Sequence, residues 1–232
     1  MIEICYHGGL GERMFQYCFG RILAERWSYR LKALPLPWFP ATREKVEGES
    51  VFSPVIPWKG DWPQEAVTGR RILPMDLHER PGVKIVLDGR FRRVDLIEEA
   101  AGRIRNDWLR PFWESRPPAN NHSAAVSDHD LVVSVRPGAC QTGLTAGCLT
   151  QEEIRHLAAS VPHERLVILT DNPEHSLVAS VRDVADAVLN LPAIDHFRTL
   201  SGSRKVAFGQ NWLDWWATFL AQSMMENYSP NN

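Results

Sequence analysis

The first 27 residues, MIEICYHGGLGERMFQYCFGRILAERW, decide the fold of this chain. Residues 1–6 alternate apolar and polar side chains as a short strand does, and the glycines of residues 7–11 end the alternation. From residue 12 to residue 27 the apolar side chains recur at steps of three and four, which places them on one face of a helix. The chain therefore opens with a strand, a glycine loop and a helix.

The rest of the first half predicts one further strand and helix after an irregular segment. Residues 34–63 carry six prolines and three tryptophans, a composition that excludes long helices. Residues 83–87 have the composition of a buried strand, and residues 94–109 place apolar side chains at helical spacing. These elements complete a first α/β unit.

A polar, proline-rich stretch at mid-chain, RPPANNHS at residues 116–123, has the composition of a linker. We place the domain boundary there, between an N-terminal domain of residues 1–118 and a C-terminal domain of residues 126–232. In the second domain, strands are predicted at 131–135, 165–169, 184–189 and 205–208, and helices after the capping box at 150–153 and at 211–225. Because parallel neighbours need a crossover, this alternation predicts an α/β fold with a parallel, Rossmann-like sheet in each domain.

Composition excludes several classes of function. The formal net charge of −2 gives no overall positive field, so we expect no nucleic-acid partner. No run approaches the ~18 apolar residues that span a bilayer, so we expect membrane association to be peripheral at most. The four cysteines lack both C-x-x-C spacing and the histidine pairing of a zinc site, and no signal peptide is recognisable. We expect reduced thiols and a cytoplasmic location.

The glycine loop, HGGLGER at residues 7–13, is the first candidate site. Glycines between a strand and a helix let a ligand approach the backbone, and the helix N-terminus adds N–H groups and partial positive charge. The loop is neither a P-loop nor a complete G-x-G-x-x-G fingerprint. A tight structural turn without a ligand is the alternative.

The second candidate site follows the predicted strand at 131–135, where residues 134–139 read SVRPGA. Arg136 would stand at the carboxyl end of a parallel strand, the edge at which α/β folds bind ligands. Its planar guanidinium suits a diphosphate. A surface ion pair is the alternative for a lone arginine.

Two further polar clusters follow predicted strands. Residues 170–173, TDNP, follow the strand at 165–169, and a helix is expected to carry Pro173 in its first turn. Asp171 is a candidate nucleotide contact there, with helix capping as the alternative. Residues 209–217, GQNWLDWWA, open the last helix, and its paired tryptophans are expected to pack into the core.

Taken in order, these segments resemble the α-1,2-fucosyltransferase family and its bacterial relatives. The family opens with Gly-Gly-Leu-Gly-Asn-(Gln/Arg)-Met-Phe-Gln-Tyr, which residues 8–17 match at all but one position. It continues with Gly-Tyr-Phe-Gln, His-Val-Arg-Arg-Gly-Asp, Ser/Thr-Asp-Asp and Asn-Ser-(Ser/Thr)-Phe-Ser-Trp-Trp. The counterparts here are residues 89–92, 134–139, 170–172 and 210–216.

The departures from the family pattern fall on polar positions. Glu12 replaces an asparagine, and a carboxylate only accepts hydrogen bonds where an amide also donates. Ser134, Pro137 and Ala139 replace the histidine, the second arginine and the aspartate. Asp214 replaces a serine at a helix start, where a carboxylate repels a diphosphate unless it is paired or turned away.

The resemblance implies a GT-B glycosyltransferase, with two Rossmann-like domains facing across a cleft. It would transfer a sugar, expected to be fucose, from a GDP-sugar to a glycan or glycolipid hydroxyl with inversion, without a metal or other cofactor, in polysaccharide biosynthesis. The residues implied are Glu12 or His7 as catalytic base, the glycine-loop residues Gly8, Gly9, Gly11 and Arg13, and the donor-binding residues Arg136, Gly138, Asp171, Asn211 and Trp212. A non-catalytic nucleotide- or glycan-binding protein of the same fold and a transferase for another nucleotide sugar are the alternatives.

Overall fold

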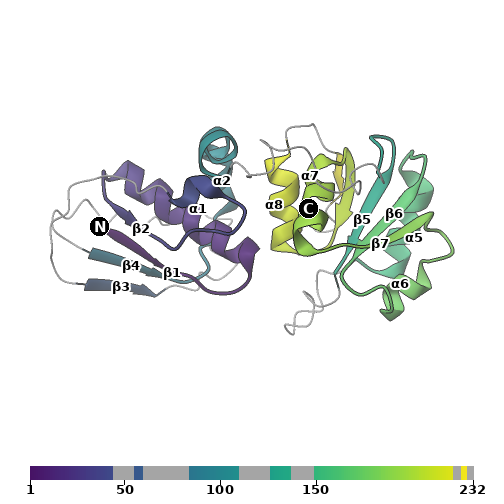
Figure 1. Cartoon of the computed structure of the whole chain (residues 1–232), viewed down its shortest axis with the longest axis horizontal. Helices are drawn as coiled ribbons and strands as arrows, with labels where there is room; N and C mark the ends of the chain where they lie inside the picture. Colours follow the sequence, from purple (N-terminus) through teal and green to yellow (C-terminus); the bar gives the residue numbers. More distant parts are fainter. Residues whose placement is uncertain (44–54, 60–83, 110–125, 137–148, 222–225, 229–232) are drawn as a thin grey trace. The chain divides into compact units, whose positions relative to one another are not determined.

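The chain divides into two compact units, Met1–Pro117 and Pro118–Asn232, each built on one sheet (Figure 1). The computed structural model describes residues 1–43, 55–59, 84–109, 126–136, 149–221 and 226–228. Every strand pair in both sheets is parallel, which confirms the predicted α/β class with parallel sheets. The linker predicted at residues 116–123 lies outside the described residues.

The first unit carries a sheet of strand order β2-β1-β4-β3. Its strands are β1 (Ile2–Cys5), β2 (Leu31–Lys32), β3 (Val55–Lys59) and β4 (Lys84–Asp88), and its helical segments are α1 (Leu10–Arg26), η1 (Pro40–Arg43), α2 (Val94–Glu99), α3 (Ala101–Arg103) and the π-helix η3 (Ile104–Trp108). The strand β3 lies at one edge of the described sheet and contains Pro57, in register with Val86 of β4.

Helix α1 packs closely on this sheet. It begins at Leu10, two residues before the predicted start, and its apolar face is buried. A Cβ on Gly20 would lie 2.6 Å from Cδ1 of Ile4, so only glycine allows this approach of helix to strand. The close packing holds α1 against β1 and β4.

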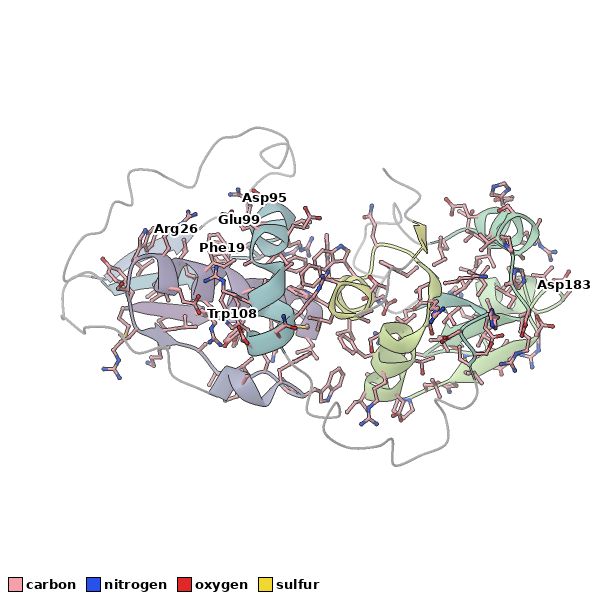
Figure 2. All side chains as sticks on the ribbon, turned by 90° about the horizontal axis from the view of Figure 1, so that it is seen from above. Phe19, Arg26, Asp95, Glu99, Trp108 and Asp183 are labelled. Carbon is pink, nitrogen blue, oxygen red and sulfur yellow. The ribbon has the colours of Figure 1, made fainter. Side chains whose placement is uncertain are left out.

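Residues 94–108 wind helically and bury the apolar face that the spacing predicted, but not as one continuous helix, because the structure divides them into α2, α3 and η3. The break between α2 and α3 falls at Ala100, two residues before Gly102, and glycine disfavours a continuous helix. The π turn carries Trp108 into the core, where Arg21 and Arg103 lie 4.9 and 5.2 Å from its ring (Figure 2). Burying this large ring under two guanidinium groups is a physical reason for the irregular winding.

The second unit carries a sheet of order β7-β6-β5-β8-β9. Its strands are β5 (Leu131–Val135), β6 (Leu166–Thr170), β7 (Ala187–Asn190), β8 (Lys205–Phe208) and β9 (Glu226–Tyr228), and its helices are α5 (Gln151–Ser160), α6 (Ser176–Ser180), α7 (Ala193–Gly202) and α8 (Trp212–Leu220). Counted along the unit, this is the order 3-2-1-4-5 of a Rossmann-like fold, whose direction of winding reverses between β5 and β8.

Helices cover both faces of this sheet (Figure 1). Leu131, Val133 and Val135 point into a core formed with α5 and α6. The residue between the last two, Ser134, must point to the opposite face, where α7 and α8 lie. Alternate side chains of β5 therefore pack into an apolar core on one face of the sheet and point toward α7 and α8 on the other.

Most elements of the second unit match their predicted positions. The strands at 131–135 and 205–208 and the capping box at Thr150 are confirmed, and β6 and β7 begin one and three residues later than predicted. The prediction that a helix holds Pro173 in its first turn is wrong, because α6 begins at Ser176 with His175 as its N-cap. Helix α8 ends at Leu220, earlier than predicted. The short strands β2, β3 and β9 were not predicted.

Candidate functional site

The carboxyl edge of the first sheet brings together two side chains from neighbouring strands. His7 follows β1 and Asp88 ends β4, and the two strands pair with Cys5 opposite Asp88. Nε2 of His7 lies 2.5 Å from Oδ1 of Asp88, and the side chains are 53% and 36% exposed. In the described sheet β1 and β4 are neighbours, and the helices that follow them, α1 and α2, pack on the same face. The carboxyl ends of parallel strands are the edge at which open α/β sheets bind ligands.

The glycine loop is fixed by hydrogen bonds from α1. The N–H of His7 donates to Oε1 of Gln16 over 3.0 Å, and Nε2 of Gln16 donates to the carbonyl of His7 over 3.4 Å. Gln16 is fully buried, so its amide is a fixed clamp on the loop backbone. Nε of Arg13 donates to the carbonyl of Gly8 over 3.0 Å. Gly9 is the N-cap residue of α1, and Gly11 is buried in its first turn.

The carboxylate of Glu12 turns back over the loop. It forms an ion pair with Arg92, and its Oε1 lies 3.8 Å from Nε of Arg90. A Cβ on Gly8 would lie 1.6 Å from Oε2 of Glu12, and Gly8 has φ of +71°. The loop therefore needs glycine at this position both for its backbone conformation and for the space that Glu12 fills.

The carboxyl edge of the second sheet presents Arg136 after β5 and Asp171 after β6. Nε of Arg136 lies 3.3 Å from Oδ2 of Asp171, and the arginine side chain is 19% exposed. The sequence prediction that Arg136 follows its strand directly is confirmed. Gly138 and the rest of the loop at 137–148 lie outside the described residues. The surface ion pair considered as an alternative for Arg136 is thus present.

Helix α8 begins after β8, the strand next to β5 in the sheet. Asn211 is its N-cap residue, and its Oδ1 accepts a hydrogen bond from the N–H of Leu213 over 2.9 Å. Its Nδ2 is buried without a hydrogen-bond partner among the described residues. Trp212 opens the helix half-buried, whereas Trp216 is fully buried and stacks edge-on with Trp215, as predicted for packing residues.

Three buried polar side chains lie beneath this edge. Oγ of Ser134 donates to Oδ2 of Asp214 over 2.6 Å and lies 3.0 Å from Nε2 of His196. A hydroxyl has a single proton, so Ser134 must accept from the Nε2–H of His196 while it donates to Asp214. Nδ1 of His196 and Oδ1 of Asp214 have no hydrogen-bond partner in the described part of the chain. All three residues are less than 4% exposed.

Burial shifts the pKa values of both titratable members in opposite directions. Desolvation raises the pKa of Asp214 to about 6, against smaller lowering effects from the Ser134 hydrogen bond and from Arg136. Desolvation also lowers the pKa of His196 to about 4, and Arg136 adds to that effect. Each group therefore favours its neutral form, as expected for titratable side chains removed from water.

The cluster of Ser134, His196 and Asp214 is not arranged for nucleophilic catalysis. In a nucleophilic arrangement the serine gives its proton to the histidine, and a carboxylate orients that histidine from its far side. Here the proton of Ser134 points to Asp214, and all three side chains are closed off from solvent. The cluster lies within the electrostatic field of this edge, because the charge of Arg136 lowers the pKa values of both His196 and Asp214.

A shallow hollow of about 250 Å³ lies between α1 and α2, near the end of α1 that is remote from the glycine loop. Its lining includes Arg26 and Glu99, which Figure 2 labels, and Glu25. Glu25 is already paired with Arg21 and Arg103. The mixed charges of this hollow favour no particular ligand.

Several residues of these edges were not predicted as site residues. These residues are Asp88, Gln16 and His196. Each contacts a predicted site residue or its neighbour because segments distant in sequence meet in the fold. His7 and Asp88, for example, are 81 positions apart. Within the described ranges, no group of three or more histidine, cysteine or acidic side chains is placed to hold a metal ion. No described helix is both long and apolar enough to cross a membrane.

Comparisons with known proteins give no relative: no protein-family model, no curated protein and no solved structure matches the chain. Any function assigned to the chain therefore rests on the residues of the two carboxyl edges and on the sequence motifs.

Proposed function

We propose that the chain is a glycosyltransferase that resembles the α-1,2-fucosyltransferases and transfers a sugar, expected to be fucose, from a GDP-sugar to a glycan or glycolipid hydroxyl with inversion. A GT-B arrangement, with the two Rossmann-like units facing across a cleft, belongs to this proposal. So do a cytoplasmic location and a role in polysaccharide assembly.

The observation that carries the proposal is the position of Arg136 at the switch point of the second sheet. It follows β5, and α8 begins after the adjacent strand β8 with the buried Nδ2 of Asn211, which has no hydrogen-bond partner within the described ranges, at its start. A guanidinium, an amide donor and a helix N-terminus together suit the diphosphate of a nucleotide sugar. Charge stabilisation of this kind assists departure of a diphosphate leaving group.

The acidic environment of Arg136 favours one alternative, a nucleotide- or glycan-binding protein without catalytic activity. Asp171 pairs with Arg136, and Asp214 lies within its electrostatic influence. An incoming diphosphate must compete with these carboxylates, which weakens binding. A transferase for a different nucleotide sugar is the other alternative, because the described residues do not show which nucleobase the donor site accepts.

Calorimetric titration of the whole chain with GDP tests the proposal. Arg136→Ala is expected to weaken binding roughly ten- to a hundredfold, because it removes a charge-assisted contact worth about 1.5–3 kcal/mol. Arg136→Lys should recover part of that loss, since it keeps the charge without the planar fork.

Arg155→Ala is the matched control, because Arg155 is also paired with an aspartate, Asp183, in the same unit (Figure 2 labels Asp183). Its GDP affinity should equal that of the wild type. Equal affinity for the wild type and Arg136→Ala would remove the diphosphate site. GDP binding without GDP release from GDP-fucose, across a panel of acceptor glycans, would favour the non-catalytic alternative.

A further inference from the structure

Among the described residues, the pair His7–Asp88 is the only side-chain hydrogen bond that joins β4 to the loop after β1, and it lies at the carboxyl edge of the first sheet. Both side chains are partly exposed, so a ligand at this edge can reach them. General bases in enzymes are most often histidines that a second group orients. The arrangement of His7 and Asp88 has this form.

The hydrogen bond determines which nitrogen of His7 is available. A carboxylate only accepts, so Nε2 of His7 must carry the proton that it shares with Asp88. In the neutral imidazole, Nδ1 then holds the lone pair that can receive a proton. The backbone of His7 is fixed by the buried amide of Gln16, so both the ring and the main chain are held from neighbouring elements.

The other candidate base, Glu12, is engaged by its own surroundings. Its carboxylate is paired with Arg92 and lies close to Arg90, and one oxygen rests over Gly8. These contacts occupy the oxygens that a base would offer to a substrate. The geometry therefore favours His7 over Glu12.

We propose that His7 is the catalytic base of the transfer and that Asp88 is its positioning residue; this rests on the proposed function. The acceptor hydroxyl gives its proton to Nδ1 of His7 as its oxygen bonds to the anomeric carbon of the donor sugar. The bond from that carbon to the diphosphate oxygen breaks, and its electron pair leaves with the nucleoside diphosphate. Asp88 stabilises the imidazolium, which then releases the proton to water.

The first experiment reads the tautomer of His7 directly and does not depend on activity. The whole chain is labelled with ¹⁵N-histidine, and long-range ¹H–¹⁵N spectra are assigned with His7→Gln. The wild type should show the Nε2–H tautomer of His7 as the dominant neutral form. Asp88→Ala should shift the population toward a mixture, whereas Asp95→Ala, which removes an exposed carboxylate paired with Arg93, should leave it unchanged.

The second experiment measures GDP release from GDP-fucose, with water and with a panel of glycans as acceptors. His7→Gln and Asp88→Ala should each lower turnover roughly ten- to a hundredfold, and the double variant should be no slower than His7→Gln alone, since the residues act as a unit. Asp95→Ala should keep wild-type turnover. GDP affinity measured by calorimetry should stay within about twofold in all of them, because neither residue contacts the donor diphosphate in the proposal.

Three results would overturn the inference. A dominant Nδ1–H tautomer in the wild type, or a tautomer that Asp88→Ala does not change, would remove the positioning role whatever the function. Undiminished turnover in His7→Gln would remove the base while leaving the glycosyltransferase proposal intact. A wild type that binds no GDP and releases none from GDP-fucose would remove the proposed function and the base role together.

Discussion

The two sheets of this protein end in polar edges that are built in opposite ways. At the first edge, His7 is hydrogen-bonded to Asp88 and Glu12 is paired with Arg92, and solvent reaches these side chains. At the second edge, Asp214 and His196 lie within the protein, whereas Arg136 and Asp171 reach the surface. An exposed pair can exchange protons with a substrate, whereas a buried cluster can only hold its neighbours in place. The difference agrees with the proposed division between proton transfer at the first edge and anion binding at the second.

The largest expected effect that tests this difference between an exposed and a buried edge is on the free energy of unfolding. Asp214→Ala leaves the hydroxyl of Ser134 without its acceptor in a dry site, and we expect a loss of roughly 2–3 kcal/mol in the free energy of unfolding. Asp88→Ala breaks a partly exposed pair and should cost less than about 1 kcal/mol. Denaturant unfolding at pH 5 measures both, and equal losses would contradict the contrast.

The pH dependence of unfolding separates the two buried titratable groups. Because burial raises the pKa of Asp214 to about 6, the folded chain keeps a proton that the unfolded chain releases above pH 3.8, so this residue's contribution to stability falls as the pH rises between these values. Because burial lowers the pKa of His196 from 6.5 to about 4, the contribution of His196 to stability rises as the pH increases from about 4 to 6.5. In the wild type the two contributions oppose one another.

Single variants should therefore reveal slopes of opposite sign. Relative to the wild type, the stability of His196→Gln should fall as the pH rises from 4 to 6, and that of Asp214→Asn should increase, each by at most about 1.4 kcal/mol per pH unit, the slope for one proton. Unfolding free energies at half-unit pH intervals measure this. Parallel curves for all three proteins would show that neither group is as buried as described.

The first edge also contains a buried polar side chain, but an uncharged one. Gln16→Leu removes both hydrogen bonds to the backbone of His7 and should cost roughly 1–2 kcal/mol, with no dependence on pH between 4 and 8. Chemical denaturation at both ends of that range measures the loss. A loss that varied with pH would mean that the clamp is coupled to a titrating group.

The smallest effect distinguishes two adjacent glycines of the loop. Gly8→Ala places a side chain where φ is +71° and where the carboxylate of Glu12 lies, so we expect a loss of about 1 kcal/mol. Gly9→Ala meets no atom within 4 Å at φ of −75°, so it should lose only the preference for glycine over alanine at an N-cap and cost less than Gly8→Ala. Thermal unfolding of both variants tests this, and equal shifts of the midpoint would contradict the loop geometry.

Local sequence patterns predicted the features that depend on residues close together in the sequence, such as the positions of strands and helices. Apolar spacing and the glycines located β1 and α1, and the capping box located the start of α5. The position of Arg136 followed from its strand alone. The family resemblance and the function drawn from it are not tested by the fold.

Contacts between distant segments could not be predicted. The pairing of His7 with Asp88 depends on β1 and β4 being neighbours, and Ser134 reaches Asp214 across 80 positions. Asp214 was expected to repel a diphosphate unless it was paired or turned away, and it is both buried and hydrogen-bonded. Strand β3 was missed because it lies in a proline-rich segment whose composition predicts irregular structure.

Pro57 in that edge strand has a consequence for how copies of the chain meet. A strand at the edge of a sheet offers unpaired backbone groups to which another chain can add a strand of its own. Proline lacks the N–H that such an intermolecular ladder needs, and it is tolerated at an edge because the missing donor can face away from the sheet. With β3 outermost in the described sheet, Pro57 leaves this strand one backbone donor fewer, which disfavours the addition of another strand along β3.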